Sequence, residues 1–124
     1  EKVGDQILIS LSAANSFRSG YAELQQGFLP TLRNVGESVA RAGGQVQVSG
    51  HTDNIPIAFS ERFDSNWDLS AARAAAVADF FFDTNDLDSE RVSVFGYADT
   101  KPVADNESPS GRAQNRRIEI LIDG

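Results

Sequence analysis

The chain has 124 residues, a length typical of one domain that buries a continuous core without disulfides or metal ions. Its net charge of −7 argues against a partner with a phosphate backbone, because nucleic-acid affinity depends on Lys and Arg, so we expect no nucleic-acid partner. Cysteine and methionine are absent, which excludes disulfides, thiol catalysis and thiolate metal sites.

No stretch approaches the roughly 20 apolar residues that span a bilayer, and no charged-then-apolar signal opens the chain. A sequence that starts at Glu1 without Met is typical of a mature or excised fragment. We therefore expect a piece of a longer protein, with room for a membrane segment upstream.

Two elements are predicted in the first third of the chain. Ile7, Ile9 and Leu11 alternate with largely polar residues, which predicts the first strand. Apolar residues then recur at helical spacing from 28 to 42, which predicts the first main helix, and Gly43-Gly44 is suited to end it.

A second strand and a second helix follow. Residues 45–49 alternate and lead into Gly50-His51-Thr52-Asp53, so these polar residues should emerge at the carboxyl end of a strand. A helix is predicted from Ser65 to about Asp83, with Ser65 or Asn66 as its N-cap and Asp68 in its first turn.

Residues 92–97 predict a third strand, and the alternating isoleucines of 118–122 predict the last one. Between them, residues 98–115 are rich in turn-forming side chains and predict a long loop with one short helix near 111–116.

The alternation of strands and helices predicts a single α/β domain over residues 1–124, an α+β sandwich in the wider sense. We expect a βαβαβ-type mixed sheet with helices packed on one face. Residues 1–25 are expected to hold the first strand and a linker-proximal segment.

Arg73 is the most informative side chain of the predicted second helix. On a helical wheel Leu69, Ala76 and Phe80 fall within about 20° of one line, and Arg73 lies inside that apolar stripe. A guanidinium directed at a core is costly unless it reaches water or meets an anion. The pattern therefore predicts a carboxylate partner, from inside or outside the chain.

Asp53 is the internal candidate, because strand and helix termini bring it near Arg73. Two interpretations remain open. The pair is either a structural ion pair that ties helix to sheet, or a split clamp for a zwitterion. In the clamp Arg73 binds a carboxylate and Asp53 binds an ammonium group.

Catalytic and metal-binding alternatives are weaker. His51 with Ser70 and Asp53 is nominally a triad, but no G-x-S-x-G elbow surrounds the serine, so we predict no enzyme. A lone His after Gly50 is typical of a hydrogen-bonded turn residue and cannot by itself form a structural zinc site. Residues 83–88 lack the Gly of a calcium loop. We expect no cofactor and no metal.

Arg112, Arg116 and Arg117 form one basic cluster before the last strand. Strand alternation places Arg116 and Arg117 on opposite faces, so at most one of them faces the site. A capping or salt-bridge role and a ligand contact both remain open.

Three ordered motifs at these residues resemble the OmpA-like peptidoglycan-binding domain: Gly50–Asp53, Asn66–Ala74 and Gly111–Glu119. The resemblance covers about residues 7–122. The run from His51 to Ile57, followed by a long loop and Ser65-Asn66-Trp67, is similar to the flagellar stator B subunits, MotB and PomB.

The resemblance implies a non-covalent grip on the stem peptide of peptidoglycan, in which Asp53 and Arg73 hold the zwitterionic end of diaminopimelate. It places six further residues around that ligand: Thr52, Asn66, Leu69, Ser70, Asn115 and Arg116.

The similarity to the stator B subunits further implies a periplasmic domain of a single-pass inner-membrane protein. It also implies a homodimer, and a stator A subunit bound through the missing transmembrane region. The alternative is an outer-membrane or envelope anchor of the OmpA or Pal type that has no link to the flagellum.

Overall fold

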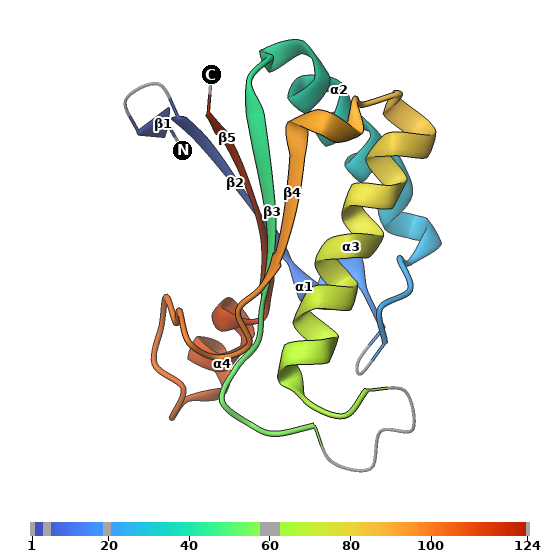
Figure 1. Ribbon diagram of the computed structural model, residues 1–124. Helices are drawn as coiled ribbons and strands as arrows, with labels where there is room; N and C mark the ends of the chain where they lie inside the picture. Colours follow the sequence, from blue (N-terminus) through green and yellow to red (C-terminus); the bar gives the residue numbers. More distant parts are fainter. Residues whose placement is uncertain (1, 4–5, 19–20, 58–62, 124) are drawn as a thin grey trace.

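The computed structural model describes residues 2–3, 6–18, 21–57 and 63–123. A five-stranded mixed sheet, ordered β1-β2-β5-β3-β4, carries the two long helices on one side (Figure 1). The elements in chain order are β1 (Lys2–Val3), β2 (Gln6–Ser12), α1 (Ala13–Ser16), η1 (Gln26–Phe28), α2 (Leu29–Ala42), β3 (Gln45–His51), α3 (Asn66–Asn85), η2 (Ser89–Arg91), β4 (Val92–Gly96), α4 (Pro109–Asn115) and β5 (Arg117–Asp123).

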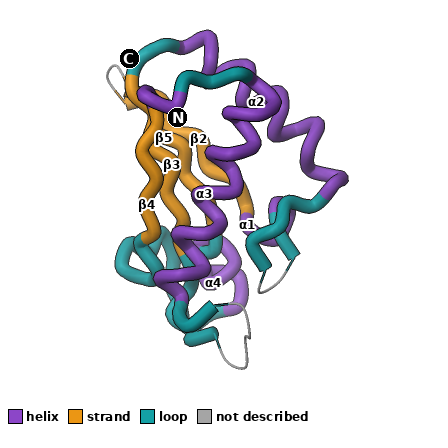
Figure 2. Tube along the Cα trace, turned by 45° about the vertical axis from the view of Figure 1, so that its right-hand side comes forward, coloured by secondary structure: helices purple, strands orange, loops and turns teal. Residues whose placement is uncertain are grey.

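The last strand of the chain lies at the centre of the sheet. β2 and β3 each pair antiparallel with β5 over seven residues, whereas β4 pairs parallel with β3. α2 and α3 lie on the same side of the strands in both views (Figure 2). The expected mixed α/β sheet with helices packed on one face is therefore confirmed.

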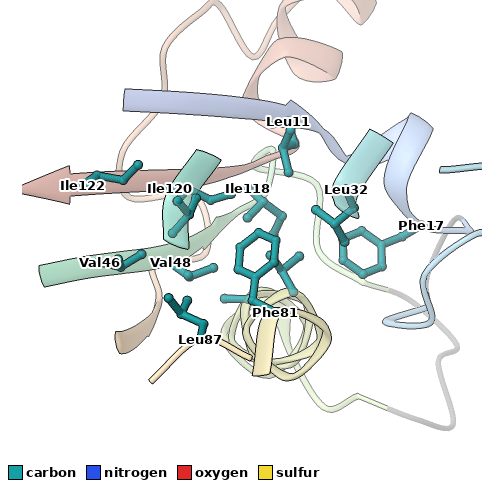
Figure 3. Close-up of a cluster of buried hydrophobic side chains, with 13 residues drawn as sticks. Leu11, Phe17, Leu32, Val46, Val48, Phe81, Leu87, Ile118, Ile120 and Ile122 are labelled. Carbon is teal, nitrogen blue, oxygen red and sulfur yellow. The ribbon is translucent and has the colours of Figure 1, made fainter. Parts of the chain in front are cut away.

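The core lies between this sheet face and the two long helices. Leu11 pairs across the sheet with Ile118, so the alternating apolar side chains of β2 and β5 share one face. Phe81 of α3 lies against the Ile118 and Ile120 side chains, and Leu32 lies beside Phe17 (Figure 3). This burial is what the alternating strand pattern predicts.

α2 forms where the helical spacing of apolar residues predicts it. A proline occupies its first turn, where the missing N–H has no partner to lose. Gly43, at φ 71°, ends the helix in a conformation that glycine adopts at little cost.

α3 begins and ends close to its predicted limits, but its buried face differs from the prediction. Ser65 caps it by accepting from the Asp68 N–H at 3.5 Å. The stripe predicted around Ala76 and Phe80 is wrong, since both are only partly buried. The fully covered face lies roughly a quarter turn away. It consists of Leu69, Ser70, Arg73, Ala74, Val77, Ala78 and Phe81.

Small residues explain this shift. A Cβ on Gly50 of β3 would meet the Ser70 carbonyl, and one on Gly96 of β4 would come within 2.7 Å of the Ala71 nitrogen. The α3 backbone therefore lies directly on the sheet. Ser70 and Ala71, which have small side chains, lie at this close contact, and Phe80 is only partly buried.

Candidate functional site

A cavity of about 520 Å³ lies at the carboxyl end of β3, beside the first turns of α3. It is the same end of the sheet to which the β3–α3 connection and α4 belong (Figure 1). Six of the eight predicted site residues line it: Thr52, Asp53, Asn66, Leu69, Arg73 and Arg116. Apolar residues complete the wall, among them Ala13, Phe17, Ile55, Pro56 and Ile57.

The carboxylate of Asp53 is held at both oxygens. Its Oδ1 accepts from the Ile55 N–H at 3.0 Å, and its Oδ2 accepts from Arg116 Nη1 at 2.6 Å. Asp53 is only 6% exposed, and the Thr52 hydroxyl fixes the adjoining backbone by donating to the Asp53 carbonyl at 2.8 Å. These contacts hold the carboxylate in one orientation at the cavity wall.

Arg73 is buried as the helical wheel predicted, at 6% exposure, but no carboxylate of the described residues pairs with it. Its Nε donates to the Tyr21 carbonyl at 2.8 Å and its Nη2 to the Arg18 carbonyl at 3.2 Å. The guanidinium also lies 5.0 Å from the centre of the Phe17 ring. Backbone carbonyls and an aromatic face thus stand where an internal carboxylate was expected.

The structural ion pair between Asp53 and Arg73 is therefore not formed. Asp53 pairs with Arg116 instead, and Arg73 lines the same cavity. Burial, and then the charge of Arg116, lower the pKa of Arg73 to about 10, so the guanidinium remains charged at neutral pH.

The described part of the cavity wall is electropositive within an acidic protein. Arg18, Arg73 and Arg116 line it together with a single acidic residue, Asp53. The chain as a whole carries a net charge of −7. The wall therefore suits a ligand that carries both negative and positive groups, with the positive group placed at Asp53.

Asn66 and Leu69 complete the helix side of the cavity. Asn66 Nδ2 donates to the Ile55 carbonyl at 3.0 Å and so ties the segment after Asp53 to the start of α3. Leu69 is buried one turn further along the same wall.

The other two predicted residues, Ser70 and Asn115, do not line the cavity. The Ser70 hydroxyl donates to the Trp67 carbonyl and accepts from the Ala98 N–H, each at 3.1 Å. Its contacts join α3 to the turn after β4. Ser70 therefore holds the start of α3, which carries Arg73, in place without contacting the cavity.

Asn115 is fully buried in its own loop. Its Oδ1 accepts from the N–H groups of Val103 and Ala104 at 2.8 and 2.9 Å. Its Nδ2 donates to the Ala104 carbonyl and to Asn106 Oδ1. Four hydrogen bonds thus organise the loop before α4.

The basic cluster divides as strand alternation predicted. Arg116 faces the cavity, whereas Arg117 is buried and donates to Glu119 Oε2 at 2.8 Å and to the carbonyls of Asn115 and Lys101. Arg112 donates to the Asn106 carbonyl at 3.0 Å. Arg116 is thus the member of the cluster placed to meet a ligand.

His51 is the last residue of β3, so its expected position in a turn is wrong. Its Nε2 lies 2.9 Å from Ser49 Oγ and 3.6 Å from Glu119 Oε1, and its ring stacks on Tyr97 at 5.3 Å. The nominal triad with Ser70 and Asp53 does not assemble. Burial, then the charge of Arg117, lower the pKa of His51 to about 4.

The residue pattern did not indicate that residues 13–18 and 21–25 contribute to the site. This segment supplies the aromatic ring and the two carbonyls that hold Arg73. Backbone acceptors leave no mark in a residue pattern. Phe17, a large apolar residue in a polar stretch, is the signal that could have indicated a buried turn.

The fold and the cavity together define an α/β domain with a charged, apolar-walled site at one end of a mixed sheet. The chain belongs to the OmpA family, whose pattern matches residues 16–116. Motility protein B of Bacillus subtilis is 38% identical over 117 residues, which cover 94% of this chain and 44% of that protein.

Solved structures share the fold of this chain. The cell wall anchor of the T6SS from Pseudomonas aeruginosa is 40% identical, with a TM-score of 0.94 over 100% of this chain and 85% of that one. The periplasmic domain of Helicobacter pylori MotB shares the fold at 23% identity, with a TM-score of 0.87 over 100% and 88% of the two chains.

The chain spans less than half the length of the first curated relatives that it matches, 48% and 44%. Within the described ranges, no helix combines the length and apolar character needed to cross a membrane.

Proposed function

We propose that this domain binds peptidoglycan non-covalently and anchors a flagellar motor stator to the cell wall. The carrying observation is that Asp53, Arg73 and Arg116 line one half-open cavity, with apolar residues beside them. A site with fixed anionic and cationic groups suits a zwitterion, and the end of diaminopimelate in a stem peptide carries one ammonium and one carboxylate group.

The hydrogen-bonding capacity of the two buried groups supports this assignment. A guanidinium has five N–H donors, and the described contacts of Arg73 use two of them. Donors therefore remain for a ligand carboxylate. Asp53 offers the complementary acceptor for an ammonium group, and the apolar wall accommodates the methylene chain between the ends of the ligand.

The similarity to Motility protein B supports the stator assignment. In this proposal the domain lies in the periplasm, an upstream transmembrane helix joins it to a stator A subunit, and two copies form a homodimer. Two sites facing a polymeric wall raise the effective concentration, with an avidity gain on the order of 100-fold. We expect no enzymatic turnover.

A second candidate is a cell-wall anchor outside the flagellum. It is favoured by the 40% identity and the TM-score of 0.94 to the cell wall anchor of the T6SS. Both candidates bind peptidoglycan through the same site and differ in the protein assembly that is anchored.

Co-sedimentation with purified sacculi tests the grip. We expect the wild-type domain to pellet, and Asp53→Asn and Arg73→Gln to weaken binding at least about tenfold, because each leaves a charged partner unpaired. Exposed residues provide matched controls, Asp79→Asn and Arg33→Gln, which should bind like wild type. Circular dichroism verifies that all variants are folded.

Failure of the wild-type domain to pellet would contradict peptidoglycan binding. Soluble fragments released from the sacculi would contradict the non-enzymatic assignment. Equal binding by Arg73→Gln with a lowered melting temperature would make Arg73 a purely structural residue.

Motility distinguishes the two candidates. We expect bacteria carrying Arg73→Gln in the full-length protein to lose swimming in soft agar, because the stator then lacks its anchor, while T6SS-dependent killing is unchanged. Loss of killing with intact swimming would contradict the stator assignment and support a cell-wall anchor outside the flagellum. Immunoblots verify equal protein levels.

A further inference from the structure

Asp53 has little free surface for an additional partner. The Ile55 N–H holds one carboxylate oxygen and Arg116 Nη1 the other, at 2.6 Å. The side chain of Asp53 is 9% exposed. Because so little of the carboxylate is exposed, an ammonium group that binds Asp53 has to take the place of Arg116 at Oδ2.

Arg116 is the partner that can move. Its side chain is 39% exposed, whereas Arg73 is buried and held by two carbonyls. Arg116 also lines a second cavity, of about 410 Å³, beside β2 and α4, so open space lies on either side of it. The guanidinium can leave Asp53 without opening a hole in the core.

The two guanidinium groups also repel each other. Both side chains line the same cavity, and the charge of Arg116 adds to burial in lowering the pKa of Arg73. A carboxylate placed between them would relieve this repulsion and accept from both.

We infer that Arg116 is an exchangeable counter-ion of Asp53. A ligand ammonium displaces it, and the freed guanidinium joins Arg73 on the ligand carboxylate. This inference rests on the proposed function and deepens it by naming the ligand class, compounds that carry ammonium and carboxylate groups on the same carbon. A lone ammonium breaks the Asp53–Arg116 ion pair and supplies no carboxylate to bind the freed Arg116. A lone carboxylate meets the unused donors of Arg73 but not those of Arg116, which Asp53 still holds.

Three probes that share a central five-carbon segment test the exchange by calorimetry. They are meso-diaminopimelate, 1,5-diaminopentane (ammonium groups only) and pimelate (carboxylates only). For the wild-type domain we expect measurable binding of meso-diaminopimelate and much weaker binding of the other two.

The variant Arg116→Gln separates the possible mechanisms. We expect it to weaken binding of meso-diaminopimelate about tenfold and to strengthen binding of 1,5-diaminopentane about threefold or more, because Asp53 is then free. Arg33→Gln on α2 makes the same change in net charge at an exposed position and should alter neither affinity by more than about twofold.

An unchanged or weakened affinity of Arg116→Gln for 1,5-diaminopentane would overturn the exchange, even if meso-diaminopimelate binding falls. Arg116 would then be a simple carboxylate contact. A variant identical to wild type with all probes would also overturn it. If the wild-type domain binds neither meso-diaminopimelate nor sacculi, the proposed function fails together with the inference.

Discussion

His51 shows how one buried side chain can make the stability of the whole domain depend on pH. The ring is 3% exposed, stacks on Tyr97, and shares its surroundings with the cations of Arg117 and Lys101. Its Nδ1 has no hydrogen-bond partner among the described residues. Burial is the largest cause of its lowered pKa, and Glu119 offsets only part of the shift.

The direction of the pH effect follows from the two states. The pKa of His51 is about 4 in the folded protein, below the ordinary value of 6.5. As the pH falls from 6.5 to 4, the unfolded chain gains a proton that the folded protein does not. The free energy of unfolding therefore falls by up to about 3 kcal/mol in this window and is unaffected by this group above it.

We predict that His51→Gln reduces the pH dependence of stability by this amount. Urea unfolding at several pH values between 7.5 and 4 measures it, and the carboxylates that titrate in both proteins cancel in the comparison. Parallel stability curves for wild type and variant would show that the pKa of His51 is the same in the folded and unfolded states.

The sequence predicted the burial of Arg73 but not the groups that bind its guanidinium. A wheel plot needs only helical periodicity, and Arg73 lies on the covered side even though the centre of the stripe was misplaced. The carbonyls that bind it belong to Arg18 and Tyr21, more than fifty positions away. Contacts over such separations depend on the tertiary fold.

At the scale of elements, the contact between α3 and the sheet depends on glycine. Gly50 and Gly96 on adjacent strands admit the backbone of α3 at Ser70 and Ala71. Gly50 lies three residues before Asp53, and Ser70 three residues before Arg73. The same close approach therefore sets the spacing between the two buried charges of the cavity.

We predict that Gly50→Ala destabilises the domain by about 2 kcal/mol, because the added methyl group meets helix backbone that cannot yield by changing rotamer. Gly27→Ala, where nothing lies within 4 Å, is the matched control and should change stability by less than about 0.5 kcal/mol. Urea unfolding measures both. Equal effects would show that α3 shifts to accommodate the methyl group.

The main strands and long helices were predictable because the apolar residues of each recur at the spacing of a strand or a helix. Residues 6–12, 45–49 and 118–122 alternate, and residues 28–42 repeat at helical spacing. The short elements were missed: β1, α1 and η1 contain two to four residues, too few to establish a period. Their formation depends on pairing and on turns supplied by the rest of the fold.

At the scale of the whole molecule, the sheet extends beyond the part of the chain that carries the family pattern. That pattern covers residues 16–116, whereas β2 precedes it and β5 follows it. These two strands pair over seven residues, and β5 also pairs with β3. Strand order could not be derived from the sequence, because pairing partners far apart in the chain are chosen by packing.

The pairing of β2 with β5 also has a mechanical consequence. Residue 6 lies at the end of β2 remote from the cavity, and α1, which follows the strand, contributes Ala13 and Ala14 to the cavity wall. Tension between the start of β2 and a ligand in the cavity therefore acts along the strand. The β2–β5 hydrogen bonds lie across that direction, so all seven residue pairs bear the load in shear at once rather than being peeled apart singly.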